Sequence, residues 1–298
     1  MILKIVVGIP AFNEEENIAK IIVKLQKVAD TIIVCNDGST DLTKEISEKM
    51  GVVVVDHPQN LGYGAGIRSI FLKASKMECD ILVTFDADGQ HRVKDIESVI
   101  EPIIKNKADI VIGSRFLKDE TNENVPKYRK IGIKAITKIT DSVTDLKLTD
   151  SQSGFRAYKK DVLKKIIPSD KGMGVSTEIL IKASCKKFKI KEVPIKILYE
   201  GDTSTHHPIS HGTSVVFSTM KYASIEHPLK FYGIPGIIFL TIGLFFVVWT
   251  LQSFSETRQI ITNISLIGIG SVILGTMLSM TAIMLYSLVS VVRERNNE

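Results

Sequence analysis

Cysteine and tryptophan are scarce in this sequence of 298 residues, which contains three cysteines and one tryptophan. Cys35, Cys79 and Cys185 lie far apart and form no CxxC pair, so they indicate neither a disulfide framework nor a cysteine-based zinc site. The N-terminus has only a short apolar run before the glutamates at positions 14–16, which is too short for a secretory signal peptide. We therefore expect the polar part of the chain to stay in the cytosol.

Charged residues are missing from two long stretches near the C-terminus. Residues 231–255 and 259–292 contain no Asp, Glu, Lys or Arg, and about 20 apolar residues of helix suffice to cross a bilayer core. The two stretches therefore predict a pair of transmembrane helices joined by a turn around residues 255–263. The alternative is a buried hairpin in a soluble core, which such long uncharged runs disfavour.

Basic residues near the ends of these stretches predict their orientation. Lys221 and Lys230 precede the first stretch, Arg293 and Arg295 follow the second, and Arg258 alone lies in the turn. Because loops with more Lys and Arg stay on the cytoplasmic side, we expect both termini in the cytoplasm. The protein is then a multi-pass protein of the cell membrane.

The residues before position 231 have an ordinary globular composition. They carry the whole net charge of +5, because three basic and three acidic residues balance each other after that point. The whole chain is 44% hydrophobic and 24% charged, which excludes disordered, collagen-like and disulfide-stapled classes. The length before residue 231 is enough for one large domain.

Short β-branched runs alternate with helical patterns in this first part. Nearly all residues of the strands are apolar, as in strands buried on both faces of a mostly parallel sheet. The pattern predicts an α/β fold with ligands beyond the carboxyl ends of the strands. The expected strands are Leu3–Gly8, Thr31–Cys35, Val52–Asp56, Ile81–Phe85, Ile110–Gly113, Phe155–Tyr158 and Ile190–Leu198; the expected helices are Glu14–Val28, Asp41–Met50, Tyr63–Lys76, Val93–Lys105, Lys127–Thr140, Val175–Lys186 and, amphipathic at the membrane surface, Ser214–Ile225.

Two carboxylates follow the fourth expected strand, in the motif FDADGQH. Asp86 and Asp88 lie two residues apart, and Gln90 adds a third oxygen donor. Oxygen ligands at this spacing suit Mg²⁺ or Mn²⁺ that also binds phosphates. A polar turn in which Asp caps a helix is the alternative, but the place at the end of a buried strand favours the metal.

Two further loops follow the first and second expected strands. PAFNEEEN, residues 10–17, fits either a nucleotide-contacting loop or a helix start with Asn13 and Glu16 in a capping box. NDGSTD, residues 36–41, fits a turn with a helix cap, or a loop that presents Asp37 to the N–H edge of a base. The glycine run after the third strand, residues 60–66, has the spacing GxGxG and the wrong position for a dinucleotide site.

Arginines and one glutamate in later loops are further candidates. Arg115 in GSR and Arg156 in SGFR are placed to bind phosphate in a bidentate manner, although a structural role is common for such residues. Glu178 opens an expected helix, where an acid can simply complement the helix dipole.

Taken together, PAFNEEENI, NDGSTD, FDADGQH, GSRF and SGFRAYKK resemble the family 2 glycosyltransferases of GT-A fold over residues 2–214. With the two apolar stretches, the chain is most similar to the dolichyl- and polyprenyl-phosphate sugar synthases, and TSTHHPISHG, residues 203–212, resembles archaeal members. This resemblance implies a catalytic domain at 1–212, a juxtamembrane segment at 213–230 and an anchor at 231–298. It implies inverting transfer of one sugar from a nucleotide-diphosphate sugar to a polyprenyl phosphate, with UDP-N-acetylglucosamine or UDP-glucose favoured over GDP-mannose.

The resemblance also implies roles for individual residues, with Mg²⁺ or Mn²⁺ as the cofactor. The partners would be the nucleotide sugar, the polyprenyl phosphate and the bilayer, without nucleic acid, and a homo-oligomer is compatible with the sequence. Asn36 departs from relatives that have a second Asp there, so the base stays open. The implied catalytic residues are Asp88, Arg115, Arg156 and Glu178; the nucleotide-sugar residues are Pro10, Phe12, Glu14, Asp37, Asp86 and Asp88; the acceptor-phosphate residues are Arg115, Arg129 and Arg156; the metal ligands are Asp86, Asp88 and Gln90.

Three other functions compete with this hypothesis. A processive polysaccharide synthase would carry a QxxRW motif, but the only tryptophan, Trp249, lies inside an uncharged stretch. A transferase that extends a lipid-linked saccharide would share the donor site and need a base such as Glu178. A membrane-anchored binding protein with an inactive transferase fold is the third.

Removal of residues 231–298 tests the predicted anchor. We expect the shortened chain to attach to membranes much more weakly, because it lacks both apolar stretches. Sedimentation of membranes from cells that express either form measures this. A shortened chain that still sediments tightly with membranes would refute the anchor.

Overall fold

The computed structural model describes residues 3–117, 127–144, 146–197 and 208–295, with side chains in these ranges except at 127–129, 208–214 and 293–295. The chain divides into two compact units, Met1–Thr219 and Met220–Glu298. This division lies inside helix α8 (Pro208–Glu226), a few residues beyond position 212, where we expect the first domain to end.

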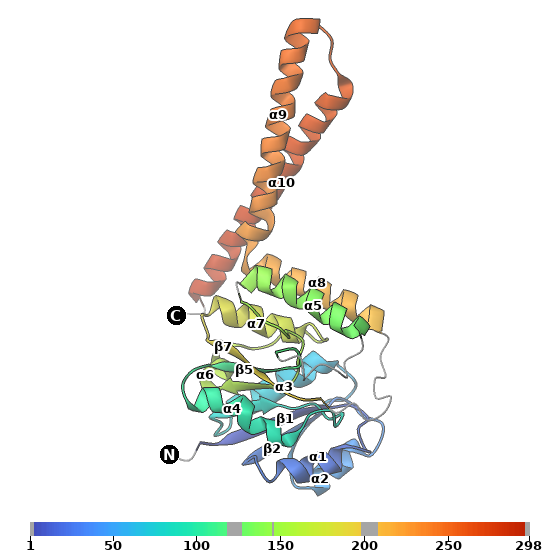
Figure 1. Ribbon diagram of the computed structural model, residues 1–298, viewed down its shortest axis with the longest axis vertical. Helices are drawn as coiled ribbons and strands as arrows, with labels where there is room; N and C mark the ends of the chain where they lie inside the picture. The colour runs from blue at the N-terminus through green and yellow to red at the C-terminus, as the bar shows by residue number, and fades with distance from the viewer. Residues whose placement is uncertain (1–2, 118–126, 145, 198–207, 296–298) are drawn as a thin grey trace. The chain divides into compact units, whose positions relative to one another are not determined.

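The first unit is built on one sheet. Its described strands form a seven-stranded sheet in the order β3-β2-β1-β4-β6-β5-β7 (Figure 1). All of these pairings are parallel except those of β6, which runs antiparallel to β4 and β5. The predicted α/β fold with a mostly parallel sheet is therefore confirmed. The strands are β1 (Ile5–Ala11), β2 (Thr31–Asn36), β3 (Val53–Asp56), β4 (Ile81–Thr84), β5 (Ile110–Ser114), β6 (Arg156–Lys159) and β7 (Ile190–Pro194).

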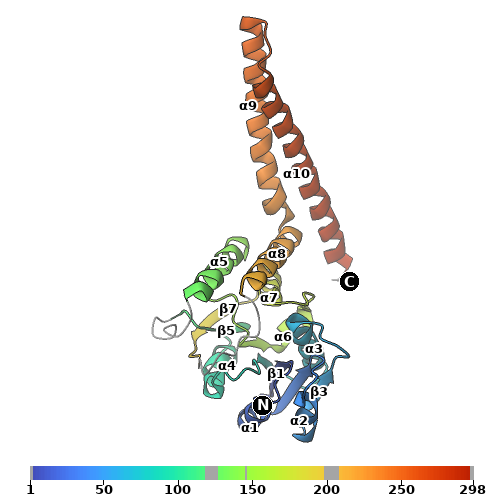
Figure 2. The ribbon, with the colours of Figure 1, turned by 90° about the vertical axis from the view of Figure 1, so that its right-hand side faces the viewer.

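Helices cover both faces of this sheet, which explains why its central strands β1, β2 and β4 are nearly all apolar (Figure 2). One core lies between the sheet and the helices α1 and α4. The other lies between the sheet and α3, α6 and α7, and α5 packs against α7. The helices are α1 (Ile18–Leu25), α2 (Thr43–Lys49), α3 (Tyr63–Ser75), α4 (Ile96–Ile104) after a short 3₁₀ turn η1 (Val93–Asp95), α5 (Lys127–Thr144), α6 (Lys160–Lys165) and α7 (Val175–Cys185).

The first helix begins later than the sequence predicts. We expected it at Glu14, but α1 begins at Ile18. Asn13 adopts a left-handed backbone with a φ of 55°, and its side-chain oxygen accepts a hydrogen bond from the backbone N–H of Thr40 at 2.9 Å. Asn13 thus joins two loops and does not cap a helix, so the capping-box interpretation is wrong.

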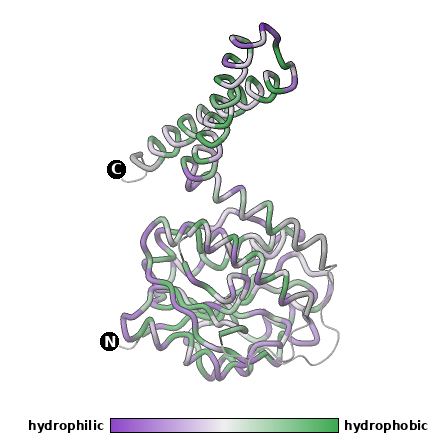
Figure 3. Tube along the Cα trace, turned by 45° about the horizontal axis from the view of Figure 1, so that its top comes forward, coloured by the Kyte–Doolittle hydropathy of each residue, from purple (hydrophilic) through white to green (hydrophobic). Residues whose placement is uncertain are grey.

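The second unit contains two long apolar helices, α9 (Ile234–Thr257) and α10 (Thr262–Arg295), preceded by a π-helical turn η3 (Leu229–Gly233). Residues Leu229–Thr257 and Thr262–Val292 are candidate membrane spans, with mean hydropathies of 2.3 and 2.0 in their most apolar windows. Figure 3 shows both helices largely in the colours of apolar residues. Large apolar side chains such as Phe245 are exposed along them, as lipid-facing side chains would be.

Glycines let α9 and α10 approach closely. A Cβ added to Gly243 would lie 2.7 Å from the backbone nitrogen of Val272, and one added to Gly236 would lie 2.6 Å from the hydroxyl of Ser279. Small residues at such positions allow van der Waals packing between membrane helices. Gly270 of α10, in contrast, has no atom within 4 Å of an added Cβ.

We predict that Gly243→Ile destabilises this hairpin, while Gly270→Ile leaves it intact. The isoleucine at 243 would force the two backbones apart, at a cost of about 1–3 kcal/mol. Trp249, the single tryptophan, lies in α9 and reports the thermal transition of the detergent-solubilised protein by fluorescence. Equal midpoints for the two variants would contradict the packing.

Candidate functional site

Three loops meet at one edge of the sheet. Strand β1 pairs in parallel with β2 and with β4, so the carboxyl ends of all three strands point the same way. The loops that follow them contain the motifs at residues 10–17, 36–41 and 85–91. This is the edge where ligands bind in open parallel sheets.

The first two loops form one hydrogen-bonded rim. Asn13 donates its backbone N–H to the hydroxyl of Ser39 at 3.0 Å, and Glu14 donates its own to Thr43 at 2.7 Å. Pro10 is half-buried beside this rim, while Phe12 is 41% exposed. The exposed ring of Phe12 can contact a ligand, as predicted, without any change in the loop.

Asp37 is held tightly at the end of β2. Its carboxylate pairs with Nδ1 of His57 at 2.6 Å and accepts the backbone N–H groups of Leu61 at 3.0 Å and Gly62 at 2.8 Å. Asp37 is only 5% exposed. In this arrangement it fastens the loop before α3, and a contact to a base stays a prediction.

Backbone donors at the start of α3 are already bonded within the protein. The N–H of Gly62 is bonded to Asp37, and the N–H of Gly64 donates to the carbonyl of Lys171 at 2.9 Å. The backbone donors on which a dinucleotide phosphate would depend are therefore occupied. This agrees with the sequence argument against a dinucleotide site.

The carboxylate of Asp86 has a partner on each oxygen. Tyr63 donates its hydroxyl to Oδ1 at 3.0 Å, and Nε2 of His91 lies 3.1 Å from Oδ2. Burial alone would raise the pKa of Asp86, but these two partners and the nearby charge of Arg115 outweigh it and hold that pKa below its usual value. Asp86 is therefore kept ionised and in one orientation.

Neighbouring side chains fix the two partners of Asp86. The ring of His91 packs against Phe85 and Phe155, with centroids 5.7 and 5.0 Å away. Burial and the adjacent Asp86 raise the pKa of Tyr63 well above its usual value, so the hydroxyl keeps its proton. A Cβ at Gly154 would lie 2.5 Å from that hydroxyl, so glycine is required there.

Asp88 and Gln90 lie in the turn that follows. Gly89 has a φ of +73°, and Gln90 donates its backbone N–H to Asp88 at 3.0 Å. The turn brings Asp88 close to Glu14 of the first loop. Burial, followed by the charges of Asp88, Asp41 and Asp86, raises the pKa of Glu14.

The negative charges of Glu14, Asp86 and Asp88 lie close together and suit a divalent cation. Among the described residues, no group of three or more His, Cys, Asp or Glu side chains could by itself hold a metal ion. Mg²⁺ and its analogues, however, commonly use one or two carboxylates and complete their coordination with phosphates and water. Asp86 and Asp88, with Gln90 beside them, fit a metal that binds together with a diphosphate.

Arg115 directly follows strand β5. Its Nε and one terminal nitrogen contact the carboxylate of Asp150 at 2.6 and 2.8 Å. Asp150 is fully buried, and its backbone N–H is held by Glu192 at 2.9 Å. The charge of Arg115 reaches Asp86, while the guanidinium side chain stays 17% exposed.

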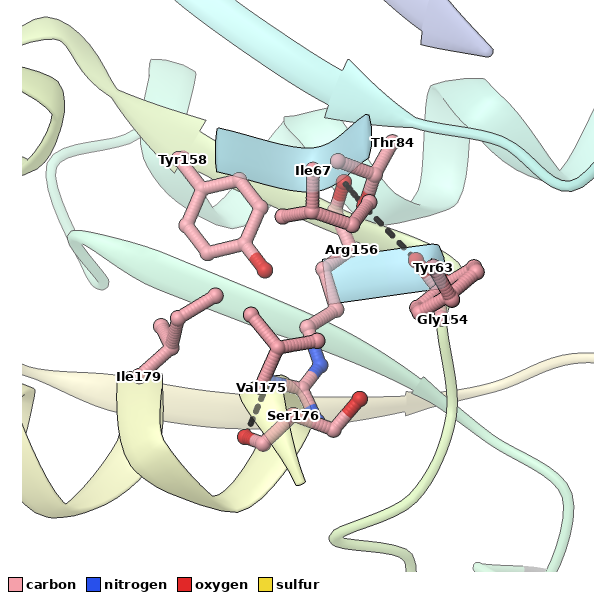
Figure 4. A pocket seen from close by; sticks show the side chains of 9 residues that line it. All are labelled: Tyr63, Ile67, Thr84, Gly154, Arg156, Tyr158, Val175, Ser176 and Ile179. Atoms are coloured by element: carbon pink, nitrogen blue, oxygen red, sulfur yellow. Dashed lines mark hydrogen bonds between the residues drawn. The ribbon is translucent and has the colours of Figure 1, made fainter. Parts of the chain in front are cut away.

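Arg156 is buried at the start of β6. Its guanidinium donates to the carbonyls of Ser153, Ser176 and Ser151 at 2.8, 2.9 and 2.7 Å, and the residue is 1% exposed. Figure 4 shows it beside Tyr63 and Tyr158, around a cavity of about 10 Å³, which is room for about one water molecule. In this arrangement Arg156 ties loops together and does not face a phosphate at the surface.

Glu178 is also buried, in the first turn of α7. Its two oxygens accept hydrogen bonds from the N–H and hydroxyl of Ser169 and from the N–H of Asp170, and Lys182 lies 2.6 Å away. It is 0% exposed. Arg129 lies in α5 by its backbone, but its side chain is outside the described residues, as are Thr203–His207 of the TSTHHPISHG stretch.

The loops after β1 and β4 bring Glu14 close to Asp86 and Asp88, and the charge of Arg115 acts on Asp86. Pro10, Phe12 and Gln90 lie in the same two loops. The structure keeps Asp37, Arg156 and Glu178 below the surface, each bonded to a loop backbone. Sequence reasoning gave no role to Tyr63 or His91, although both stand in quoted motifs. The one available signal was the place of His91 just after FDADGQ, since Tyr63 lies 23 residues from Asp86 in sequence.

We predict that Glu14→Gln stabilises the protein at neutral pH when EDTA keeps it free of metal. A carboxyl with a higher pKa in the folded chain binds its proton more tightly there, so its ionisation lowers stability as pH rises through that pKa. The glutamine is never ionised and still accepts the bond that Asn17 donates to Glu14. The gain in thermal midpoint should be present at pH 7 and vanish below about pH 4. A gain in thermal midpoint of the same size at both pH values would show that burial and the nearby acids do not raise the pKa of Glu14.

Comparison with known proteins agrees with this architecture. Residues 6–167 match the family described as Glycosyl transferase family 2. The chain is 37% identical over 228 residues to the UDP-N-acetylglucosamine–dolichyl-phosphate N-acetylglucosaminyltransferase of Methanococcus voltae, covering 70% of this chain and 89% of that protein. It is 36% identical over 208 residues to the dolichol-phosphate mannosyltransferase of Pyrococcus furiosus, covering 64% and 56%.

A solved structure shows the same fold. The glucosyl-3-phosphoglycerate synthase of Mycobacterium tuberculosis superposes with a TM-score of 0.60 at 19% identity, over 74% of this chain and 81% of that one. At this identity the likeness concerns the fold alone. The sheet, the loops at its carboxyl edge and the family match over more than half of the sequence lead to one conclusion: the chain belongs to glycosyl transferase family 2 and has a GT-A-like α/β fold.

Proposed function

We propose that this protein transfers one sugar from a nucleotide-diphosphate sugar to a polyprenyl or dolichyl phosphate at the cytoplasmic face of the membrane, with inversion. The observation that carries this proposal is the carboxylate of Asp86, which Tyr63 and His91 hold just after β4, two residues before Asp88 and within reach of the charge of Arg115. The candidate membrane spans of the same chain provide the anchor that a lipid acceptor requires.

The donor would lie over the rim of the first two loops. In this proposal Pro10, Phe12 and Glu14 contact the nucleotide, and Asp37 contributes through the loop that it fastens. Asp86, Asp88 and Gln90 would hold Mg²⁺ or Mn²⁺. The metal, when bound, neutralises the charge that develops on the diphosphate leaving group.

The acceptor phosphate would be oriented by Arg115. Its bidentate contact with Asp150 fixes the guanidinium plane, and a planar guanidinium suits a phosphate. A phosphate monoester has a second pKa near 6, so it is largely a dianion at neutral pH and needs no strong base. The protein then has only to align the phosphate with the sugar carbon. Arg129 remains a candidate for the same phosphate.

The position of Glu178 favours this acceptor over a sugar hydroxyl. A transferase that extends a lipid-linked saccharide needs a base. Glu178 is the named candidate for this base, although another acid could take the role. Its oxygens are occupied by Ser169, Asp170 and Lys182 and are closed to solvent. This supports transfer to a phosphate.

The relatives support the substrate classes without deciding the sugar. One relative is named for UDP-N-acetylglucosamine and another for mannose. We favour UDP-N-acetylglucosamine or UDP-glucose over GDP-mannose, because the first relative matches over 89% of its length and the second over 56%. Protein or envelope glycosylation would use the product.

We further propose the three-part organisation of 1–212, 213–230 and 231–298, with both termini in the cytoplasm. Lys221 and Lys230 on one side and Arg258 alone in the turn support this orientation. We also propose that the enzyme depends on its metal ion and has no nucleic acid partner.

A donor-by-acceptor assay tests the proposal. Membranes that contain the protein receive Mg²⁺ or Mn²⁺, a short polyprenyl phosphate and, separately, UDP-N-acetylglucosamine, UDP-glucose or GDP-mannose. We expect mass spectrometry to find a prenyl-phosphate monosaccharide with one donor. Product formed only from a prenyl-linked saccharide would favour the extending transferase, and no turnover of any donor would favour a binding protein.

In the same assay, Asp88→Ala should lower turnover by at least about 100-fold, because the metal loses a carboxylate ligand. Asp161→Ala, at an exposed position of α6, is the control and should leave turnover unchanged. Near-normal turnover in a folded Asp88→Ala protein would refute the site.

A further inference from the structure

A short loop between α6 and α7 links a buried acid to the start of α3. We call residues 168–174, with the sequence PSDKGMG, the linking loop. Glu178 binds one side of it through the two N–H groups of Ser169 and Asp170, at 2.8–3.0 Å, and through the hydroxyl of Ser169 at 2.6 Å. These bonds hold the loop backbone at two successive residues.

Lys182 completes the environment of Glu178. Its ammonium group lies 2.6 Å from Oε1 of Glu178 and donates to the carbonyl of Ile167 at 2.9 Å. The two carboxylate oxygens thus receive donors from three residues, close to the number that a carboxylate can accept. A buried charge with this many partners is costly to alter, because each lost bond leaves an unpaired donor.

The opposite side of the linking loop supports α3. The carbonyl of Lys171 accepts the N–H of Gly64 at 2.9 Å. A Cβ at Gly62 would lie 2.4 Å from that carbonyl oxygen, and one at Gly64 would lie 2.2 Å from the carbonyl oxygen of Asp170. The loop and the helix start therefore touch backbone to backbone, which only glycine permits.

Tyr63 stands between these two glycines. Its hydroxyl donates to Oδ1 of Asp86 at 3.0 Å, so its position depends on the backbone that the linking loop supports. The contacts form one continuous series: Glu178 binds the linking loop, the loop caps α3, and the first residue of α3 orients Asp86.

We propose that Glu178 is a positioning residue of the donor site, which acts on Asp86 through the linking loop and Tyr63. The inference rests on the proposed function only in treating Asp86 as the donor-side carboxylate. It gives Glu178 a role in catalysis that requires no contact with substrate. It also explains why a buried acid occupies the first turn of α7, beyond any effect on the helix dipole.

The main variant is Glu178→Gln in the full-length protein. The glutamine is nearly the same size, but its NH₂ group must face one of the donors of Ser169, Asp170 or Lys182. Asp109→Asn is the matched control. Asp109 likewise accepts a backbone N–H, that of Lys189 at 2.9 Å, but it precedes β5 and lies at the opposite edge of the sheet.

Hydrogen exchange measures the structural link without any turnover. In Glu178→Gln we expect faster exchange in peptides that cover the linking loop and residues 61–66, while Asp109→Asn speeds exchange only around residue 189. Unchanged protection of residues 61–66 in a variant with a mobile linking loop would overturn the proposal. Should Glu178→Gln fail to fold, Ser169→Ala removes one of the same bonds and should show a weaker form of this pattern.

Kinetics measures the consequence for the donor site. We expect the donor KM of Glu178→Gln to rise about tenfold while the acceptor KM changes less than about twofold. Tyr63→Phe should raise the donor KM similarly, and the double variant should be little worse than the poorer single variant, because both act on one series of contacts. Additive effects, or a loss confined to the acceptor KM, would overturn the proposal.

The two measurements separate this inference from the proposed function. If the wild-type protein transfers no sugar, the proposed function fails, while hydrogen exchange still decides whether Glu178 supports α3. If the wild type is active and Glu178→Gln keeps both its exchange pattern and its donor KM, the inference alone fails.

Discussion

The ionised carboxylate of Asp86 is the group around which the candidate site is arranged. Burial alone would raise the pKa of an acid that follows a buried strand. Tyr63 on one oxygen and His91 on the other, with the charge of Arg115 nearby, reverse that tendency. Each partner is itself fixed, His91 by two phenylalanine rings and Tyr63 by the close-packed start of α3. The site therefore presents one oriented charge before any ligand arrives, which limits the reorganisation needed on binding.

Buried or half-buried acids elsewhere in the first unit fix the loops around this charge. Asp37 fastens the loop before α3, Glu178 fastens the linking loop, and Glu192 holds the N–H groups of Thr149 and Asp150. Each of these carboxylates binds backbone N–H groups of a segment that lies outside the sheet. Loops have few apolar contacts to fix them, so polar bonds of this kind supply the rigidity that a site requires. Arg156 does the same with carbonyl groups.

Much of the fold could be predicted from the sequence because its strands are buried on both faces. The runs that form β1, β2 and β4 are nearly all apolar, and polar motifs follow their carboxyl ends. Together these two features indicate the edge of the sheet at which the site lies. Short elements were less accessible. Four residues, RAYK, form β6, and nothing in them shows that the strand runs antiparallel. The six residues of α6 are too few to show a helical pattern.

The site was predictable in its residue types and less so in its contacts. The apolar run before Asp86 and Asp88 was enough to predict that two acids follow a strand. For Glu178, the sequence shows only an acid at the start of a helix, which is compatible with a catalytic base. It does not show which groups that acid contacts. Its contacts with Ser169 and Asp170 depend on a loop whose path is set by the packing of α6, α7 and α3. The same holds for Tyr63, which meets Asp86 only because α3 and β4 are neighbours in the folded chain.

In the proposed donor site, Asp86 and Asp88 hold the cation that binds the diphosphate of the donor. Crystals of the full-length protein grown with Mn²⁺ together with UDP, and others grown with Mn²⁺ together with GDP, locate the metal directly by its anomalous scattering. We expect one strong manganese peak within coordination distance of these carboxylates, with the diphosphate bound to the same ion. A diphosphate bound elsewhere on the first unit, with manganese away from Asp86 and Asp88, would contradict the proposed site.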